Sequence, residues 1–195
     1  NPLDFIKITQ MKTFTPNSNR LIKNLLTEMD ARELIWEQRT AKGGFQTQSN
    51  IFVDPSKNIL LLKKFIEQEV EAFHKKFKSS GSILIQNWPG RYFLKGWYNK
   101  LLRNGYQESH IHPAGWISGI IYLKTLKNPV ENEGAIEFSL HGFNYPVTAD
   151  DYPSRLYQPC DGDIVLFPSS LFHKTVPILK EAERCVIAFD LIPKD

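Results

Sequence analysis

From residue 83 onward the chain consists of short β-type segments separated by proline, glycine, asparagine and aspartate, without the period of a helix of normal length. Eight or nine short strands within about a hundred residues are typical of a sandwich or barrel, and a jelly roll is one standard way to pack them. No internal repeat competes with this interpretation. The expected strands are 83–86, 93–102, 107–112, 117–124, 135–140, 155–158, 163–167, 173–177 and 184–192.

The first third of the chain has helical periodicity instead. Apolar residues recur at i, i+3 and i+4 spacing over residues 21–29, behind asparagine and serine residues that suit a helix N-cap. A glycine-containing break at residues 41–44 precedes a second helical stretch, which starts at residues 54–56 and ends at the Ser-Ser-Gly cluster of residues 79–81. We therefore expect residues 1–82 to form a helical N-terminal buttress and residues 83–195 to form the β core.

Length and composition indicate a single domain over residues 1–195, because 42% apolar and 12% aromatic residues suffice for one substantial core. The net charge of +3 comes without a basic block, so we expect no nucleic-acid partner. No apolar run reaches the roughly 18 residues of a membrane span. Cys160 and Cys185 form no CxxC pair, which favours a reducing, cytoplasmic setting. Because the sequence starts at Asn1 rather than methionine, we expect a processed or excised piece, which leaves room for additional domains outside it.

Two of the five histidines lie in the segment Glu-Ser-His-Ile-His-Pro, residues 108–113. Strand geometry sends Glu108, His110 and His112 to the same face. Two neutral imidazoles placed two residues apart on a strand reach one Fe(II), Zn(II), Cu(II) or Ni(II) ion without distorting the backbone. The pair alone is a weak signal, because His-x-His occurs by chance on many exposed strands.

His173 and Arg184 strengthen the signal. His173 follows a turn at Gly162, an apolar strand and a Phe-Pro-Ser loop, and Arg184 begins the next apolar strand. A buried guanidinium is costly unless it is paired, and its fork fits a carboxylate through two parallel hydrogen bonds. The partner of Arg184 is therefore either an acid of this chain, in a structural salt bridge, or a bound carboxylate.

In combination, these motifs resemble those of the 2-oxoglutarate and Fe(II)-dependent oxygenase superfamily, and most of all members with a prolyl-hydroxylase-like fold. The resemblance implies a mainly β fold with N-terminal helices, in which a double-stranded β-helix (jelly roll, cupin-like) is buttressed by α-helices. It also implies an oxidoreductase that uses Fe(II), 2-oxoglutarate and O2. The matching motifs are His-x-His-Pro at 110–113, Ser-Gly-x-x-Tyr-Leu at 118–123, the segment from glycine to Phe-Pro-Ser at 162–169, and Arg184.

The resemblance implies roles for individual residues. His110 and His173 would bind the metal, and Arg184 would hold the distal carboxylate of 2-oxoglutarate. Tyr122 stands at the position from which related enzymes hydrogen-bond this carboxylate. The alternative for Tyr122 is an aromatic residue of the core.

Residue 112 departs from the family's usual His-x-Asp or His-x-Glu, which provides two imidazoles and one carboxylate. His112 is a third ligand, or it stands aside and leaves a two-histidine site, or Glu108 supplies the carboxylate. We favour the first arrangement, with His110, His112 and His173 as the catalytic metal ligands, because residue 112 occupies the acid position of the motif. The Glu108 arrangement ranks last.

The expected reaction is hydroxylation of a substrate C–H bond with release of succinate and CO2. The substrate is a small molecule, a free amino acid or a peptide, and the resemblance does not choose among them. Two alternatives remain from the residues: a cupin-like metalloenzyme that does not use 2-oxoglutarate, and a non-catalytic β-sandwich binding module.

Overall fold

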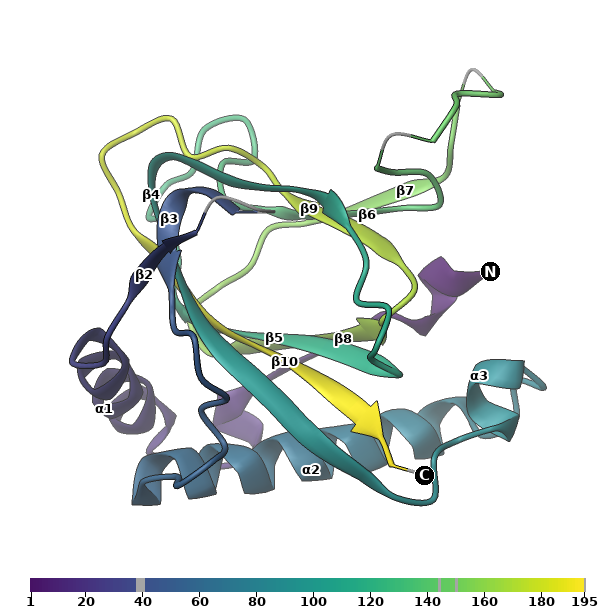
Figure 1. Cartoon of the computed structure of the whole chain (residues 1–195), viewed down its shortest axis with the longest axis horizontal. Coiled ribbons are helices and arrows are strands. Elements are labelled where there is room, and N and C mark those ends of the chain that lie inside the picture. Colours follow the sequence, from purple (N-terminus) through teal and green to yellow (C-terminus); the bar gives the residue numbers. More distant parts are fainter. Residues whose placement is uncertain (38–40, 144, 150, 195) are drawn as a thin grey trace.

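Antiparallel strands form one strongly curled sheet, and helices pack against one of its faces (Figure 1). The computed structural model describes residues 1–37, 41–143, 145–149 and 151–194, and within these residues the sheet has ten strands. The strands are β1 (Lys7–Gln10), β2 (Ile35–Glu37), β3 (Ala41–Gln46), β4 (Tyr92–His110), β5 (Ile117–Lys124), β6 (Ile136–Ser139), β7 (Ser154–Tyr157), β8 (Asp163–Pro168), β9 (Phe172–Thr175) and β10 (Arg184–Pro193). The helices are α1 (Ser18–Asp30), α2 (Lys57–Phe77) and α3 (Ile83–Gln86), with short 3-10 helices η1 (Pro2–Phe5) and η2 (Met11–Thr13).

Strand β4 carries the sheet from one layer to the other. Its 19 residues pair with β10 along the first half, with β3 in the middle, and with β9 at Gln107 and His110 near the end. The strand order is β1-β8-β5-β10-β4-β9-β6-β7, so β5, β8 and β10 face β6 and β9 across an apolar interior (Figure 1). This half-barrel of two facing layers confirms the predicted fold class.

Side-chain alternation along β10 divides the core in two. Ile187, Phe189 and Leu191 pack with residues of α1 and α2, whereas Val186 packs in the interior between the layers. Gly119 on β5 belongs to the helix-side packing, because a Cβ atom there would lie 2.2 Å from the ring of Phe189. The central strands are therefore buried on both faces, and their register decides which side chains reach the interior.

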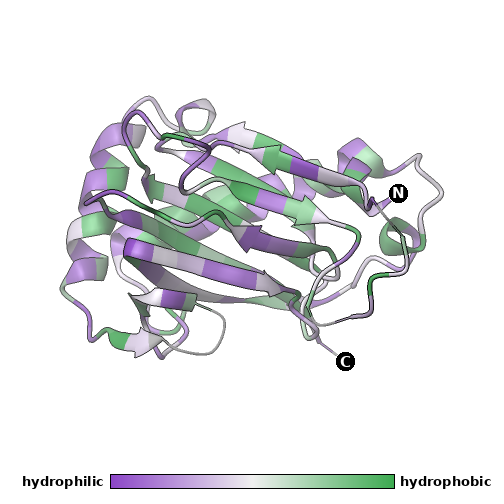
Figure 2. Cartoon of the chain, turned by 90° about the horizontal axis from the view of Figure 1, so that it is seen from above, coloured by the Kyte–Doolittle hydropathy of each residue, from purple (hydrophilic) through white to green (hydrophobic). Residues whose placement is uncertain are grey.

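Helices α1 and α2 cover the outer face of the larger layer, as the apolar periodicity predicts (Figure 1). The side chain of Ser56 caps α2 by accepting a hydrogen bond from the Ile59 N–H, and the basic residues His74, Lys75 and Lys76 suit its last turn. Figure 2 shows helices banded with hydrophobic and hydrophilic residues, which is typical of helices that lie on a core. In the part of the chain that the structure describes, no helix is long and apolar enough to cross a membrane.

Two strand predictions in the C-terminal part are wrong. Residues 83–86 form the short helix α3 rather than a strand, with Ile85 buried and Ile83 exposed. A short apolar run without alternation does not distinguish a helical turn from a strand. The strands expected at 93–102 and 107–112 are the single strand β4, because its central residues pair with β3.

The N-terminal segment, residues 1–82, is not helical throughout. Strand β1 pairs with β8, and β3 pairs with β4, so this segment also extends the sheet. The break in helical periodicity at residues 41–44 lies in β3, where a Cβ atom on Gly44 would lie 2.6 Å from the Lys100 carbonyl oxygen. Such short strands lack an alternating pattern of their own and form because a sheet edge is available beside them.

Leu62 and Leu60 on α2 provide a matched test of this packing, because Leu62 is fully buried and Leu60 is 45% exposed. The substitution Leu62→Ala should lower the free energy of unfolding by about 2–5 kcal/mol, through lost burial and the cavity left behind. The control Leu60→Ala should change it by about 0.5 kcal/mol or less. Chemical denaturation measures both, and equal losses would contradict the described orientation of α2.

Candidate functional site

Three histidines meet where β4 ends beside β9. His110 is the last residue of β4 and pairs with His173 of β9, and His112 follows in the turn after β4. The ring centroids of His110 and His173 are 4.3 Å apart, and the His112 ring lies 5.2 Å and 5.1 Å from them. One ring nitrogen of each histidine lies within 4.8 Å of the other two. This spacing fits a single metal ion.

Main-chain carbonyl groups orient two of the imidazoles. The Nδ1 atom of His110 donates to the carbonyl oxygen of Glu108 at 2.7 Å, and Nδ1 of His173 donates to that of Leu171 at 3.0 Å. Because a carbonyl oxygen only accepts hydrogen bonds, the proton of each neutral ring lies on Nδ1. The Nε2 atoms therefore keep their lone pairs for a metal ion.

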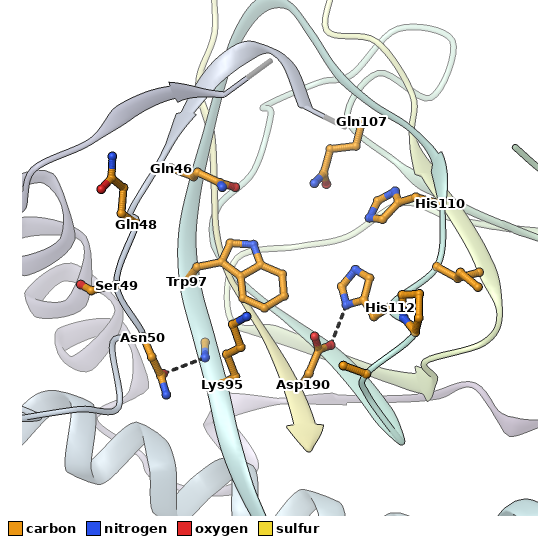
Figure 3. A pocket seen from close by; sticks show the side chains of 14 residues that line it. Gln46, Gln48, Ser49, Asn50, Lys95, Trp97, Gln107, His110, His112 and Asp190 are labelled. Carbon is orange, nitrogen blue, oxygen red and sulfur yellow. Dashed lines mark hydrogen bonds and ion pairs between the residues drawn. The ribbon is translucent and has the colours of Figure 1, made fainter. Parts of the chain in front are cut away.

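A buried polar network anchors the third imidazole, His112. Its Nδ1 atom donates to Oδ1 of Asp190 at 2.6 Å (Figure 3), and Ser118 Oγ donates to the same oxygen at 2.7 Å. Ser118 Oγ also bonds to Ser169 Oγ at 2.8 Å, and the main-chain N–H of His112 donates to the Ser169 carbonyl oxygen at 2.9 Å. The two serine-containing motifs thus hold the histidine turn in place.

Asp190 was not singled out from the sequence. A signal was available, because Asp190 lies six residues after Arg184 in an otherwise apolar strand. An even spacing places both side chains on the same face of a strand.

Burial keeps two of the imidazoles neutral. It lowers the pKa of His173 well below its usual value, and the neighbouring rings of His110 and His112 lower this pKa further. Burial also lowers the pKa of His110, against the opposing effect of its hydrogen bond to the Glu108 carbonyl. Because imidazole binds metals in its neutral form, His110 and His173 are ready to act as ligands at neutral pH.

Of the three arrangements considered for residue 112, the geometry favours the three-histidine set. A ring nitrogen of His112 lies with those of His110 and His173, and within the described residues no carboxylate joins this cluster. Glu108 contributes its main-chain carbonyl to the orientation of His110. The assignment of the three histidines as ligands stays a prediction.

A second group of polar side chains lies in the same interior. Arg184 begins β10, and its Nε atom donates to the Gly134 carbonyl oxygen at 3.0 Å. Its guanidinium lies 5.0 Å from the centroid of the Tyr122 ring. Val186 pairs with Tyr122 on β5 and with Asn99 on β4, so these two side chains lie on the same side of the sheet.

The polar tips of Arg184, Tyr122 and Asn99 have no partner among the described residues. Each residue is at most 1% exposed. The unpartnered atoms are the terminal nitrogens of Arg184, the hydroxyl of Tyr122, and the amide oxygen and nitrogen of Asn99. An unsatisfied buried polar group costs about 1–3 kcal/mol, so three such side chains together suit the binding of a polar ligand.

These donors suit a carboxylate ligand. Within the described residues, Arg184 forms no salt bridge with an acid of this chain, which removes the structural alternative considered for it. Burial raises the pKa of Tyr122, so its hydroxyl stays protonated and can donate a hydrogen bond. Asn99 was given no role from the sequence, and the only signal was an amide within a strand of largely apolar and aromatic residues.

The histidine cluster opens onto a cavity of about 440 Å³ (Figure 3). One wall is Trp97, whose ring centroid lies 5.5 Å from that of His112. The amides of Gln46 and Gln107 and the exposed Lys95 also line the cavity. A substrate in this cavity would lie beside the proposed metal position.

A family model identifies the class of protein. The model described as "Putative 2OG-Fe(II) oxygenase" matches residues 95–190, which include the three histidines, Tyr122 and Arg184. The chain belongs to the 2-oxoglutarate and Fe(II)-dependent oxygenases. This oxygenase is therefore an oxidoreductase that uses Fe(II), 2-oxoglutarate and O2. No curated protein sequence matches the chain.

Solved structures of other oxygenases share its fold. A prolyl-4-hydroxylase from Pseudomonas putida covers 97% of this chain and 93% of its own, with a TM-score of 0.67 and 13% identity. HygX from Streptomyces hygroscopicus, with nickel and 2-oxoglutarate bound, covers 97% and 83%, with a TM-score of 0.59 and 11% identity. A Trichoplax adhaerens prolyl hydroxylase, in complex with a hypoxia inducible factor peptide fragment, covers 96% and 83%, with a TM-score of 0.63 and 13% identity. At such low identity the similarity shows the fold alone.

The residues of this oxygenase fit the two groups that the family uses. Three imidazoles that converge on one point suit Fe(II), for which imidazole is a good ligand. The unpartnered donors of Arg184 and Tyr122 suit a carboxylate such as that of 2-oxoglutarate.

The lowered histidine pKa values make the metal-free oxygenase sensitive to acid. In the unfolded chain, His110 and His173 take up protons near the usual pKa of about 6.5, whereas the fold resists this protonation. Folding stability should therefore be complete above about pH 6.5 and decrease below it, by at most about 1.4 kcal/mol per pH unit for each histidine. Urea unfolding in the presence of a chelator measures this slope.

The variant His173→Gln isolates the contribution of one imidazole. Below about pH 6.5, the free energy of unfolding of this variant should fall less steeply with decreasing pH, by the contribution of about one proton. This holds whatever the effect of the substitution on stability at neutral pH. A slope that does not change in this variant would contradict the lowered pKa of His173.

Proposed function

We propose that this oxygenase hydroxylates a C–H bond of a small molecule, an amino acid or a peptide, and converts 2-oxoglutarate to succinate and CO2. In this proposal His110, His112 and His173 bind the iron, and Arg184 and Tyr122 bind the distal carboxylate of 2-oxoglutarate. One observation carries it: three converging ring nitrogens share an interior with a buried guanidinium whose terminal nitrogens have no partner among the described residues.

The histidines hold the iron, which supplies the oxidising chemistry once 2-oxoglutarate and O2 are bound. The carbonyl hydrogen bonds of His110 and His173 keep their Nε2 atoms aimed inward. His112 is aimed in the same way by Asp190. Because the three rings are fixed before metal binds, little conformational entropy is lost on binding.

Arg184 and Tyr122 hold the keto acid. The terminal guanidinium nitrogens, which have no partner among the described residues, would donate hydrogen bonds to one carboxylate, and the Tyr122 hydroxyl would donate another. Asn99 faces the same interior from β4, and we assign its amide to the same ligand. All three groups are shielded from water, which strengthens their attraction to a negative charge.

The cavity beside the histidines receives the substrate in this proposal. Trp97 offers an apolar wall, Gln46 and Gln107 offer amide groups, and Lys95 offers a positive charge. Such walls suit a polar substrate with some apolar surface. Two similar structures hold bound molecules of different kinds: HygX has hygromycin B bound, and the Trichoplax adhaerens hydroxylase is in complex with a peptide fragment.

The two alternatives from the sequence account for less of the site. A cupin-like metalloenzyme that does not use 2-oxoglutarate does not explain why the buried donors of Arg184 and Tyr122 have no partner among the described residues. A non-catalytic β-sandwich module does not explain why three histidine rings converge. The family match also places the chain among enzymes that use 2-oxoglutarate.

Anaerobic titration tests the proposed function. Addition of equimolar Fe(II) and then 2-oxoglutarate should produce the weak visible charge-transfer band of a chelated keto acid, and admission of air should produce succinate. Protein loaded with Zn(II) is the control, because zinc has no redox chemistry and should give neither signal. The absence of both signals from the Fe(II) protein would reject the proposal.

Arg184→Met separates the oxygenase from a cupin-like metalloenzyme. The variant keeps an unbranched apolar stem but loses the charged guanidinium group. Binding of 2-oxoglutarate should weaken about 100-fold or more, because a buried carboxylate loses its partner. Binding of Fe(II) without 2-oxoglutarate should be unchanged, and calorimetry under argon measures both.

The control for Arg184→Met is Arg103→Met, at an exposed arginine that pairs with Glu181. This control should leave both binding constants unchanged. If Arg184→Met also leaves 2-oxoglutarate binding unchanged, the keto acid does not bind at Arg184.

A further inference from the structure

Asp190 stands behind the one histidine that departs from the family's motif. It is 6% exposed, and its Oδ1 atom accepts the 2.6 Å hydrogen bond from Nδ1 of His112 (Figure 3). The other two imidazoles, His110 and His173, bond instead to uncharged main-chain carbonyl groups. Of the three rings, His112 alone has an anionic partner.

The usual site with two histidines and one carboxylate can be compared in charge with the three-histidine site proposed here. In the usual motif, the acid at this position places one negative charge directly on the metal. The neutral imidazole of His112 places none, and Asp190 restores one negative charge a single hydrogen bond further out. The total charge of ligands and partner is therefore the same in both arrangements.

We propose that Asp190 is a positioning residue that acts through His112, and that it supplies the negative charge which a carboxylate ligand would otherwise place on the iron. The inference rests on the proposed function, because it takes His112 as an iron ligand. The hydrogen bond fixes the His112 tautomer that leaves Nε2 free. A carboxylate acceptor at Nδ1 also makes Nε2 a stronger donor to the metal.

Two cationic or titratable side chains lie near Asp190: His112, and Lys95, which is its cross-strand neighbour on β4 and lines the same cavity but is exposed to solvent. His112 contacts the carboxylate as a neutral hydrogen-bond donor, and among the described residues no lysine or arginine forms a salt bridge with Asp190. Ser118 donates a neutral hydrogen bond to the carboxylate and is itself bonded to Ser169, and neither hydroxyl balances the charge. Since a buried charge is costly unless it is paired, a metal cation held by His112 would stabilise the Asp190 carboxylate through the imidazole ring.

A purely structural role for Asp190 is the competing explanation. Asp190 joins β10 to β5 through Ser118, so its loss can loosen the histidine turn without any effect of charge. The two explanations differ in what happens when residue 112 carries a charge of its own. A structural link is needed in either case, whereas a substitute charge is needed only beside a neutral ligand.

The test is the Fe(II) affinity of four proteins: the wild type, Asp190→Asn, His112→Asp and the double variant. Anaerobic competition with a chromophoric chelator measures it without any turnover. In the wild-type background, Asp190→Asn should weaken Fe(II) binding about 10- to 100-fold, as is typical for loss of a carboxylate behind a metal-binding histidine. In the His112→Asp background, Asp190→Asn should cause no loss, because it removes a like charge from beside the new ligand.

A second readout reports on charge at the iron. With 2-oxoglutarate bound, Asp190→Asn should shift the visible charge-transfer band to shorter wavelength, because the iron is less electron-rich. The control Ser118→Ala removes a hydrogen bond to the same oxygen of Asp190 but keeps the charge. It should leave the band in place and weaken Fe(II) binding less than Asp190→Asn does.

The outcomes separate this inference from the proposed function. Equal losses from Asp190→Asn in both backgrounds, or no loss in the wild-type background, would overturn the role of Asp190 and leave the proposed function intact. A wild-type protein that does not bind Fe(II) would overturn both. Metal-free melting temperatures identify any variant that is not folded. If Asp190→Asn or His112→Asp is not folded, the charge-transfer band of Ser118→Ala decides between the two explanations. An unmoved band supports the role of the Asp190 charge, and a shifted band supports a purely structural role of Asp190.

Discussion

The antiparallel pairing of β10 with β4 on one side and β5 on the other is the constraint on which the rest of the structure depends. Through side-chain alternation, this pairing turns Ile187 and Phe189 toward the helices and Arg184 and Asp190 toward the interior. A register shift of one residue would exchange the two faces. It would bury the guanidinium against apolar helices and remove two polar groups from the site. The packing of the core and the chemistry of the site are thus set by one register.

The histidine cluster depends on a second pairing, that of β4 with β9, which sets His110 beside His173. Main-chain carbonyl groups then orient these two rings, so the arrangement needs few dedicated side chains. His112 lies beyond the paired strand and relies on Asp190, Ser118 and the Ser169 carbonyl oxygen instead. In the proposed function, β10 therefore serves both ends of the site, through Arg184 at the keto acid and through Asp190 at the metal.

Much of the candidate site is predictable from the sequence because its pattern is local. The spacing of His110 and His112 on a strand, and the order of the motifs up to His173 and Arg184, require no knowledge of the fold. The contacts of Asp190 are not local, since its histidine partner lies 78 residues away. The same difference between local and non-local signals applies to the secondary structure. Helices α1 and α2 are predictable from their own apolar periodicity, whereas β1 and β3 form because they pair with the distant strands β8 and β4.

The central claim is that iron is held by three imidazoles in a family that usually provides two imidazoles and a carboxylate. X-ray absorption at the iron edge of the anaerobic Fe(II) protein tests it directly, because scattering from the imidazole rings counts the histidine ligands. We expect three imidazoles in the wild-type protein and two in a His112→Ala variant. A wild-type spectrum with two imidazoles and a protein carboxylate would contradict the three-histidine centre.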